Sequence, residues 1–198
     1  MVTRPGDGGW LDLRELLQQA ENQPGLQRYR RRRWGRSEEF AGWIGEAALA
    51  SLSMERATSM YVAAGGKSRT EFESNTVEEI RESLDFLLYD TVMLEGRFQE
   101  CAAEGGAYKL AGAGKELVSY LLCVRDPTLF AVWDSNVERA LRKLGVPTED
   151  LKKSPLGVGY LELLEALSPV RRRLGLADFR AVDEFAYALT RGAGQGGL

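Results

Sequence analysis

One stretch of the chain, residues 109–145, constrains its fold more than any other. It contains a glycine-rich turn, LAGAG at residues 110–114, followed at once by an apolar run from Leu117 to Val124. Two glycines separated by one residue allow the backbone to turn sharply and to approach a neighbour closely. The pattern predicts a helix, a tight turn and a second helix over residues 109–124, with the second helix starting directly after the turn.

The start of that second helix is a candidate anion-binding site. The first N–H groups of a helix have no partner within the helix, and the helix dipole favours negative charge there. A phosphate group is the simplest ligand for such a geometry. Gly112, Gly114 and Lys115 are therefore candidate phosphate contacts.

Asp134 is a second candidate site residue, 20 positions after Gly114 (134 − 114). It follows a proline-containing loop and precedes a predicted helix over residues 137–144. We expect Asp134 to cap this helix, because an aspartate oxygen can accept hydrogen bonds from the first N–H groups. A carboxylate here can also take part in chemistry, because one oxygen can cap the helix while the other faces a substrate.

Together the two segments resemble the helix-hairpin-helix DNA glycosylases, and most closely the branch of adenine DNA glycosylase and endonuclease III. The family pattern is L-P-G-V-G-x-[KS]-x-A, followed about twenty residues later by V-D-x-N-V-x-R. Here LAGAG at residues 110–114 stands for the hairpin, and DSNVER at residues 134–139 stands for the aspartate segment. The matched part is about a fifth of the chain. The resemblance implies an all-α fold, double-stranded DNA with a damaged or modified base as the partner, and Asp134 as the catalytic carboxylate, without a cofactor.

The sequence departs from the family pattern at the nucleophile. In bifunctional members, a lysine two residues after the last hairpin glycine attacks the sugar, whereas Glu116 stands there and the lysine is Lys115. One helical step rotates a side chain by about 100°. The resemblance thus implies a monofunctional enzyme that uses water, with Lys115 as a phosphate contact or, as the alternative, a displaced nucleophile. Ala111 also replaces the proline of the pattern.

The resemblance implies further site residues. Family members carry a helix similar to W-L-S-E-V-M-L, and residues 43–49, WIGEAAL, look similar. In the adenine branch that glutamate protonates the leaving base, which makes Glu46 a candidate acid; a surface or helix-pairing glutamate is the alternative. A glycosylase must also hold the flipped base between apolar or aromatic faces. The candidates for this pocket, each of which can equally belong to the core, are Phe40, Trp43, Tyr120 and Trp133.

The distribution of charge suggests a DNA-binding surface, although the net charge is −3. Arginines are dense between residues 28 and 36, and a second basic block spans residues 171–173. A solvated face is the alternative for any single block. With the hairpin residues, the candidate DNA contacts are Lys109, Gly112, Gly114, Lys115, Arg31, Arg32 and Arg33.

The composition excludes several kinds of site. The chain has no histidine, which removes histidine-based triads and histidine metal sites. Its two cysteines, Cys101 and Cys123, lie in apolar helical patterns and cannot form a structural zinc site alone. We therefore expect no metal and two buried thiols. No apolar run approaches the eighteen or so residues of a membrane span, and no secretory signal is apparent, so we expect a cytoplasmic monomer.

The spacing of apolar residues predicts an all-α fold, because no β-hairpin signal occurs. We expect a single helical domain over residues 10–191, between a flexible N-terminus at 1–9 and a disordered glycine-rich tail at 192–198. Within the domain, the predicted helices span residues 10–20, 38–51, 53–64, 77–89, 91–104, 137–144, 159–174 (bent or broken at Pro169) and 178–191, with a loop at 64–68 and polar residues at 70–75.

Three hypotheses for the function follow. The first is a monofunctional DNA glycosylase that removes either a damaged base in repair or a hypermodified base of phage DNA in defence. The second is a non-catalytic helix-hairpin-helix module that binds DNA in a restriction, defence or repair system. The third is a helical protein–protein adaptor in which the hairpin is only a packing turn. A pocket beside Asp134 favours the first hypothesis over the other two.

Overall fold

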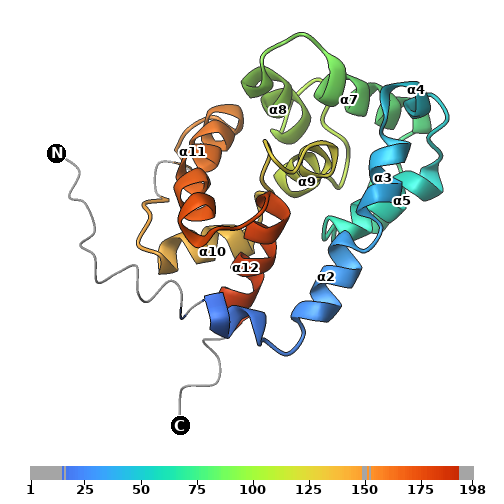
Figure 1. Cartoon of the computed structure of the whole chain (residues 1–198). Helices are drawn as coiled ribbons and strands as arrows, with labels where there is room; N and C mark the ends of the chain where they lie inside the picture. Colours follow the sequence, from blue (N-terminus) through green and yellow to red (C-terminus); the bar gives the residue numbers. More distant parts are fainter. Residues whose placement is uncertain (1–14, 16, 149–150, 152, 192–198) are drawn as a thin grey trace.

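The computed structural model describes residues 15, 17–148, 151 and 153–191, and every regular element in this part is a helix (Figure 1). This confirms the all-α prediction. The termini predicted to be flexible or disordered, 1–9 and 192–198, lie outside the described residues, as does most of the helix predicted over 10–20. None of the described helices is long and apolar enough to cross a membrane.

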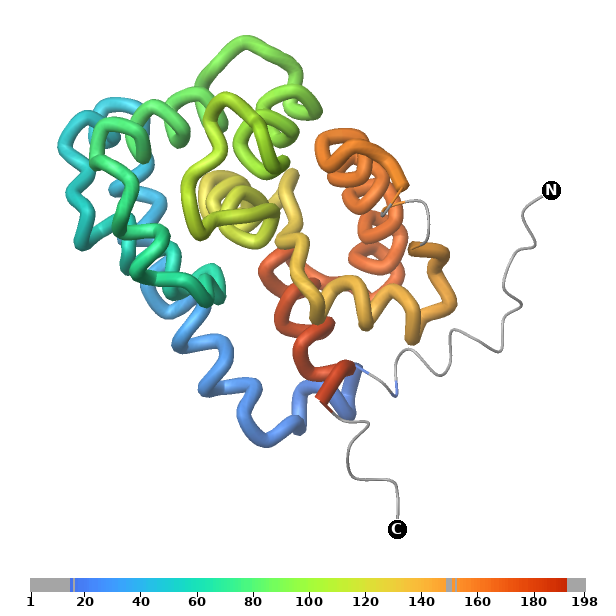
Figure 2. Tube along the Cα trace, turned by 180° about the vertical axis from the view of Figure 1, so that it is seen from behind, coloured from blue at the N-terminus to red at the C-terminus, as the bar shows by residue number. Residues whose placement is uncertain are grey.

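The helices surround a central one. Figures 1 and 2 show α9 (Lys115–Arg125) in the interior, with α3 and α5 on one side and α10, α11 and α12 on the other. The first helices are α2 (Leu26–Trp34), α3 (Ser37–Trp43), α4 (Glu46–Leu49), α5 (Met54–Ala63), α6 (Arg69–Phe72) and α7 (Val77–Tyr89). The others are α8 (Leu94–Ala102), α10 (Ser135–Lys143), α11 (Leu156–Leu174) and α12 (Phe179–Arg191).

The position of α9 follows from its sequence. Every residue from Leu117 to Val124 is buried, as expected for a helix that is apolar on all sides. It packs against α8, α3 and α7. The helix that begins at the hairpin is therefore the fixed centre of the molecule.

Local signals set other helix ends. At the start of α7, Thr76 Oγ1 accepts a hydrogen bond from the Glu79 N–H, and the Glu79 carboxylate accepts one from the Thr76 N–H. This capping box confirms the predicted start, and such a cap stabilises a helix by about 1 kcal/mol. At the other end of the chain, α11 runs through Pro169 without a break and ends at Gly175, whose φ is 64°.

One prediction in the first half of the chain was wrong. The helix predicted over 38–51 is two helices, α3 and α4, because Gly45 between them is extended, with φ −61° and ψ 143°. Ser37, one residue before the predicted start, lies inside α3, where its hydroxyl accepts a hydrogen bond from Arg180. The polar residues 70–75, for which no helix was predicted, contain most of the short helix α6.

The hairpin also differs from its prediction. Helix α8 ends at Ala102, and residues 103–114 connect it to α9 without a helix before the turn. The early end has a local cause. Gly105 adopts a positive φ of 81°, and the Gly106 N–H bonds back to the Ala103 carbonyl, which turns the chain away from the helix axis.

Candidate functional site

The glycine turn is packed tightly on the start of α6. Gly112 has a φ of +69°, and a Cβ built on it would lie 2.8 Å from the Phe72 nitrogen and 2.9 Å from the Ser68 oxygen. Both the backbone angle and the close approach require glycine at this position. The Tyr61 hydroxyl donates to the Gly112 carbonyl at 2.8 Å, and Asn75 bonds both the N–H and the carbonyl of Ala111. The turn is therefore held by the elements around it.

Lys109 points into this turn. Its Nζ donates to the carbonyls of Leu110 and Ala113 and lies 3.2 Å from a carboxylate oxygen of Glu104. The side chain is only 13% exposed. The structure thus places this predicted DNA contact as an internal brace of the turn.

Asp134 caps α10, as predicted. Its Oδ1 accepts from the N–H groups of Asn136 at 2.8 Å and Val137 at 3.0 Å. Its Oδ2 accepts from Nη2 of Arg33 at 3.1 Å. The residue is buried, with 7% of its surface exposed, and what remains exposed faces a pocket.

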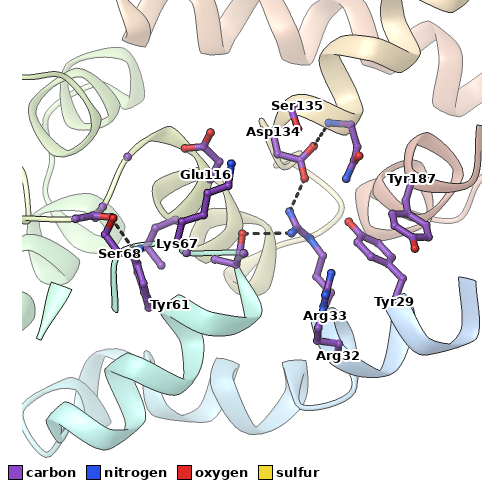
Figure 3. A pocket seen from close by; sticks show the side chains of 18 of the residues that line it. Tyr29, Arg32, Arg33, Tyr61, Lys67, Ser68, Glu116, Asp134, Ser135 and Tyr187 are labelled. Carbon is purple, nitrogen blue, oxygen red and sulfur yellow. Dashed lines mark hydrogen bonds and ion pairs between the residues drawn. The ribbon is translucent and has the colours of Figure 1, made fainter. Parts of the chain in front are cut away.

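The pocket has a volume of about 360 Å³ and lies where α2, α5, α9, α10 and α12 approach one another (Figure 3). This is within the range of small-ligand sites, about 300–1,000 Å³. Gly112, Gly114, Glu116 and Asp134 all line it, together with the loop at 65–68. The structure therefore brings the hairpin and the aspartate segment to one cavity.

An aromatic pair forms another part of the wall. The rings of Tyr29 and Tyr187 are stacked, with centroids 3.9 Å apart and an interplanar angle of 10°. The guanidinium groups of Arg32 and Arg191 lie 5.9 and 5.5 Å from the centroids of Tyr29 and Tyr187, respectively. All four residues line the pocket. The sequence analysis missed both tyrosines, because no local pattern relates residues of α2 and α12.

None of the four aromatic residues predicted for a base pocket lines this cavity. Phe40, Tyr120 and Trp133 are core residues, each 2% exposed or less. The Tyr120 hydroxyl donates to the Arg33 carbonyl at 2.6 Å and so ties α9 to α2. Trp43 packs on Phe40 at the edge of the core. For these residues the structure agrees with the alternative given above, a place in the core.

The two other predicted catalytic residues also lie away from the pocket. The Lys115 ammonium pairs with Glu138 and sits 4.3 Å from the centroid of the Trp133 ring, while its neighbour Glu116 lines the cavity. Glu46, the first residue of α4, is exposed and is not among the lining residues. This corresponds to the surface alternative for Glu46.

The arginine run divides between the surface and the interior. Arg31 and Arg32 are exposed, and Arg32 lines the pocket. Arg33, predicted with them as a DNA contact, is only 4% exposed. It lies on the side of α2 that faces the core, one turn after the buried Tyr29. Its guanidinium is therefore part of the floor of the pocket.

Arg33 joins two acidic residues below the pocket. Besides the contact with Asp134, its Nη1 donates to the Ala64 carbonyl at 3.2 Å, and its Nε lies 3.2 Å from Oδ2 of Asp183. Asp183 also accepts hydrogen bonds from the Tyr29 hydroxyl and from Nε1 of Trp34. We call these five side chains, Tyr29, Arg33, Trp34, Asp134 and Asp183, the buried arginine network.

Burial controls the protonation of this network. It raises the pKa of Asp183 to about 6, against the lowering effect of Arg33 and of the hydrogen bonds from Tyr29 and Trp34. Burial lowers the pKa of Arg33, but Asp183, Tyr29 and Asp134 raise it more, so the guanidinium stays charged. Burial also raises the pKa of Tyr29, which stays neutral at neutral pH.

The cysteines and the acidic residues offer no second chemistry in the described part of the chain. Cys101 and Cys123 are free and buried, and burial raises the pKa of the Cys101 thiol to about 12. No group of three or more His, Cys, Asp or Glu side chains that could hold a metal ion occurs among the described residues.

Comparison of the chain with protein-family models, with curated proteins and with solved structures finds no match. The functional argument therefore depends on the geometry of the pocket and on the two short sequence motifs that meet there.

Proposed function

We propose that this chain is a monofunctional DNA glycosylase that removes a damaged or modified base and leaves an abasic site. One observation carries the proposal: Asp134, Gly112 and Gly114 line the same pocket. The motif resemblance assigns these residues to catalysis and to phosphate binding, and nothing in the motif itself requires a cavity between them. Their meeting there favours a catalytic site over a packing turn.

The proposed reaction breaks the bond between C1′ of the deoxyribose and a nitrogen of the base. The base leaves with the bonding electron pair, and positive charge develops on the sugar. Asp134 stabilises that charge through Oδ2, because Oδ1 is occupied by the helix N–H groups. Water then adds to C1′ and loses a proton, while the departing base gains one, so that the overall step is a hydrolysis.

The rest of the pocket supports binding of a flipped nucleotide. Tyr187 of α12, the less buried member of the stacked tyrosine pair, offers an aromatic side chain that a base can contact. Besides the buried Arg33, the lining has three cationic residues, Arg32, Lys67 and Arg191, which suit the phosphates on either side of the base. The N-terminus of α9 adds N–H groups directly after Gly114.

A base-excision assay tests the proposal. The protein and its Asp134→Asn variant are incubated with DNA that carries mixed lesions and with hypermodified phage DNA, and alkali then cleaves abasic sites. We expect alkali-dependent breaks with the wild type and a rate at least about 100-fold lower in the variant. Asparagine also caps helices, so the variant is a matched control for folding. Equal activity of the two proteins would contradict the role of Asp134, and the substrate that is cut separates repair from defence.

The contact between Arg33 and Asp134 favours a second candidate function. Asp134 accepts hydrogen bonds from two backbone N–H groups and from a guanidinium, so its role can be purely structural. The chain would then be a non-catalytic DNA-binding module. DNA binding by fluorescence anisotropy, with intact DNA on every substrate, would support this alternative. Breaks that form without alkali would instead indicate an amine nucleophile, such as Lys115.

A further inference from the structure

Two sets of contacts hold the Asp134 carboxylate. One is with helix α10, which Asp134 caps, and the other is with Arg33 of the buried arginine network. Helix α10 fixes Oδ1 of Asp134, so the orientation of the carboxylate is set by the contacts of Oδ2. Among the described residues, the side-chain partner of Oδ2 is Nη2 of Arg33, at 3.1 Å (Figure 3). What holds Arg33 therefore determines how Oδ2 is presented to the pocket.

Arg33 is held by separate parts of the chain. Its Nη1 bonds the Ala64 carbonyl at the end of α5, and its Nε faces Asp183 of α12. Its own carbonyl accepts from Tyr120 of α9. A planar guanidinium that donates hydrogen bonds through Nη1 and Nη2 and is ion-paired at Nε cannot turn without losing one of these contacts. The group is therefore pre-organised before any ligand enters.

Asp183 is fixed in turn. Both of its oxygens accept from the Tyr29 hydroxyl, at 2.9 and 2.8 Å, and Oδ2 also accepts from Trp34 at 2.9 Å. Its side chain is 1% exposed, and that of Arg33 is 5% exposed. Charges this far from solvent interact more strongly than surface pairs, because little water screens them.

We propose that Arg33 is the positioning residue of the site: Asp183 anchors its guanidinium, and the guanidinium holds Oδ2 of Asp134 in a fixed orientation at the pocket. This inference rests on the proposed function, which gives the Asp134 carboxylate its role. A carboxylate that is already oriented needs little reorganisation when positive charge develops on the sugar. Arg33 acts through Asp134, and Asp183 acts through Arg33.

The other titratable groups packed against the network are neutral near neutral pH. They are Tyr120 and Cys123 on α9, and burial raises the pKa of both. Asp178 and Arg180, at the start of α12, lie close enough to influence the pKa of Cys123 in opposite directions. Tyr29, within the network, is neutral as well, because burial raises its pKa.

The test follows the carboxyl carbon of Asp134 by NMR. The protein is labelled with ¹³C at the aspartate carboxyl carbons, the Asp134 signal is identified by its loss in Asp134→Asn, and its chemical shift is compared between the wild type and each variant at one pH. Arg33→Met removes the side-chain partner of Oδ2, so we expect the signal to move and to broaden. Asp183→Asn removes the anchor of Arg33, so we expect a change in the same direction. Arg28→Met, an exposed arginine of the same helix, is the control and should leave the signal unchanged.

A change that the two variants share and that Arg28→Met lacks distinguishes positioning from general damage. Circular dichroism checks that each variant is folded, and if Arg33→Met does not fold, Asp183→Asn decides alone. An Asp134 signal that keeps its wild-type chemical shift in the folded variants overturns the proposal. The NMR measurement needs no substrate, so it is separate from the excision assay. If DNA is cut, Arg33→Met should also lower the maximal excision rate more than it weakens DNA binding, and an unchanged rate would overturn the proposal as well.

Discussion

At the scale of single residues, the most informative position is Glu116. In the proposed resemblance to the helix-hairpin-helix glycosylases, it stands at the position of their lysine nucleophile. Glu116 lines the pocket, whereas Lys115 is turned toward Glu138 and Trp133. The structure thus separates the lysine from the cavity by one helical step. The absence of an amine at position 116 is consistent with the proposed monofunctional reaction.

A substitution at this position tests that reasoning. In Glu116→Lys, the new amine can attack C1′ as the base leaves, form a Schiff base with the opened sugar and cut the strand without alkali. Borohydride reduction should then trap a covalent protein–DNA adduct, seen as a shifted band on a denaturing gel. Adding Lys115→Ala in the same chain should preserve the adduct. Trapping that disappears with Lys115 would show that the native lysine reaches the sugar.

Gly112 allows a prediction about stability rather than activity. Gly112→Ala combines a positive φ with a backbone atom 2.8 Å from the new Cβ, so we expect it to lower the free energy of unfolding by about 1–3 kcal/mol. Gly105 is the matched control, because its φ is +81° but nothing lies within 4 Å of a new Cβ. Chemical denaturation should show a smaller loss for Gly105→Ala. Equal losses would mean that the close approach to α6 contributes nothing.

At the scale of elements, the hairpin turn and α2 divide the cationic residues by role. Lys109 braces the turn through two carbonyls, while Arg32 of α2 is exposed at the pocket. Only a side chain that reaches a phosphate releases counterions when DNA binds. The salt dependence of binding therefore distinguishes the two roles.

We expect Arg32→Met to reduce the slope of log binding constant against log salt by about 0.9, the value for one phosphate contact. Lys109→Met should leave that slope unchanged and should instead destabilise the fold by about 1.5–3 kcal/mol, because two carbonyls lose a charged donor. Fluorescence anisotropy at several salt concentrations and urea denaturation measure the two effects. A reduced slope in Lys109→Met would show that this lysine leaves the turn to contact DNA.

Features that depend on local sequence could be predicted, whereas contacts between distant helices could not. The cap at Asp134, the start of α7 at residue 77 and the apolar run of α9 depend on residues within a few positions, and each was predicted. The stacked pair Tyr29–Tyr187 depends on contacts between α2 and α12, which no local pattern contains. The contacts of Arg33 with Asp134 and Asp183 also join residues far apart in sequence, and a run of arginines does not show which of its members is buried.

At the scale of the whole molecule, the buried arginine network joins the first long helix of the described chain to the last. The Tyr29 hydroxyl of α2 and the carboxylate of Asp183 on α12 are 154 positions apart in sequence. A second contact of the same kind, between Arg30 and Glu184, lies beside it at the surface. The pocket therefore exists only when both ends of the described chain are packed together, so its geometry and the global stability should change together.

The pH dependence of stability provides a test of this coupling. The pKa of Asp183 is raised in the folded state to about 6 from 3.8, so the folded protein holds that proton more tightly than the unfolded chain. The stabilisation from this proton is fully present below about pH 4 and is lost as pH rises through 6, by about 3 kcal/mol for a shift of this size. Asp183→Asn should remove this loss between pH 4 and 7, although the amide also costs hydrogen bonds at every pH. Urea denaturation of both proteins across this range measures the difference. A wild-type protein and a variant whose unfolding free energies run parallel from pH 4 to 7 would show that Asp183 is already ionised at acid pH, held so by Arg33.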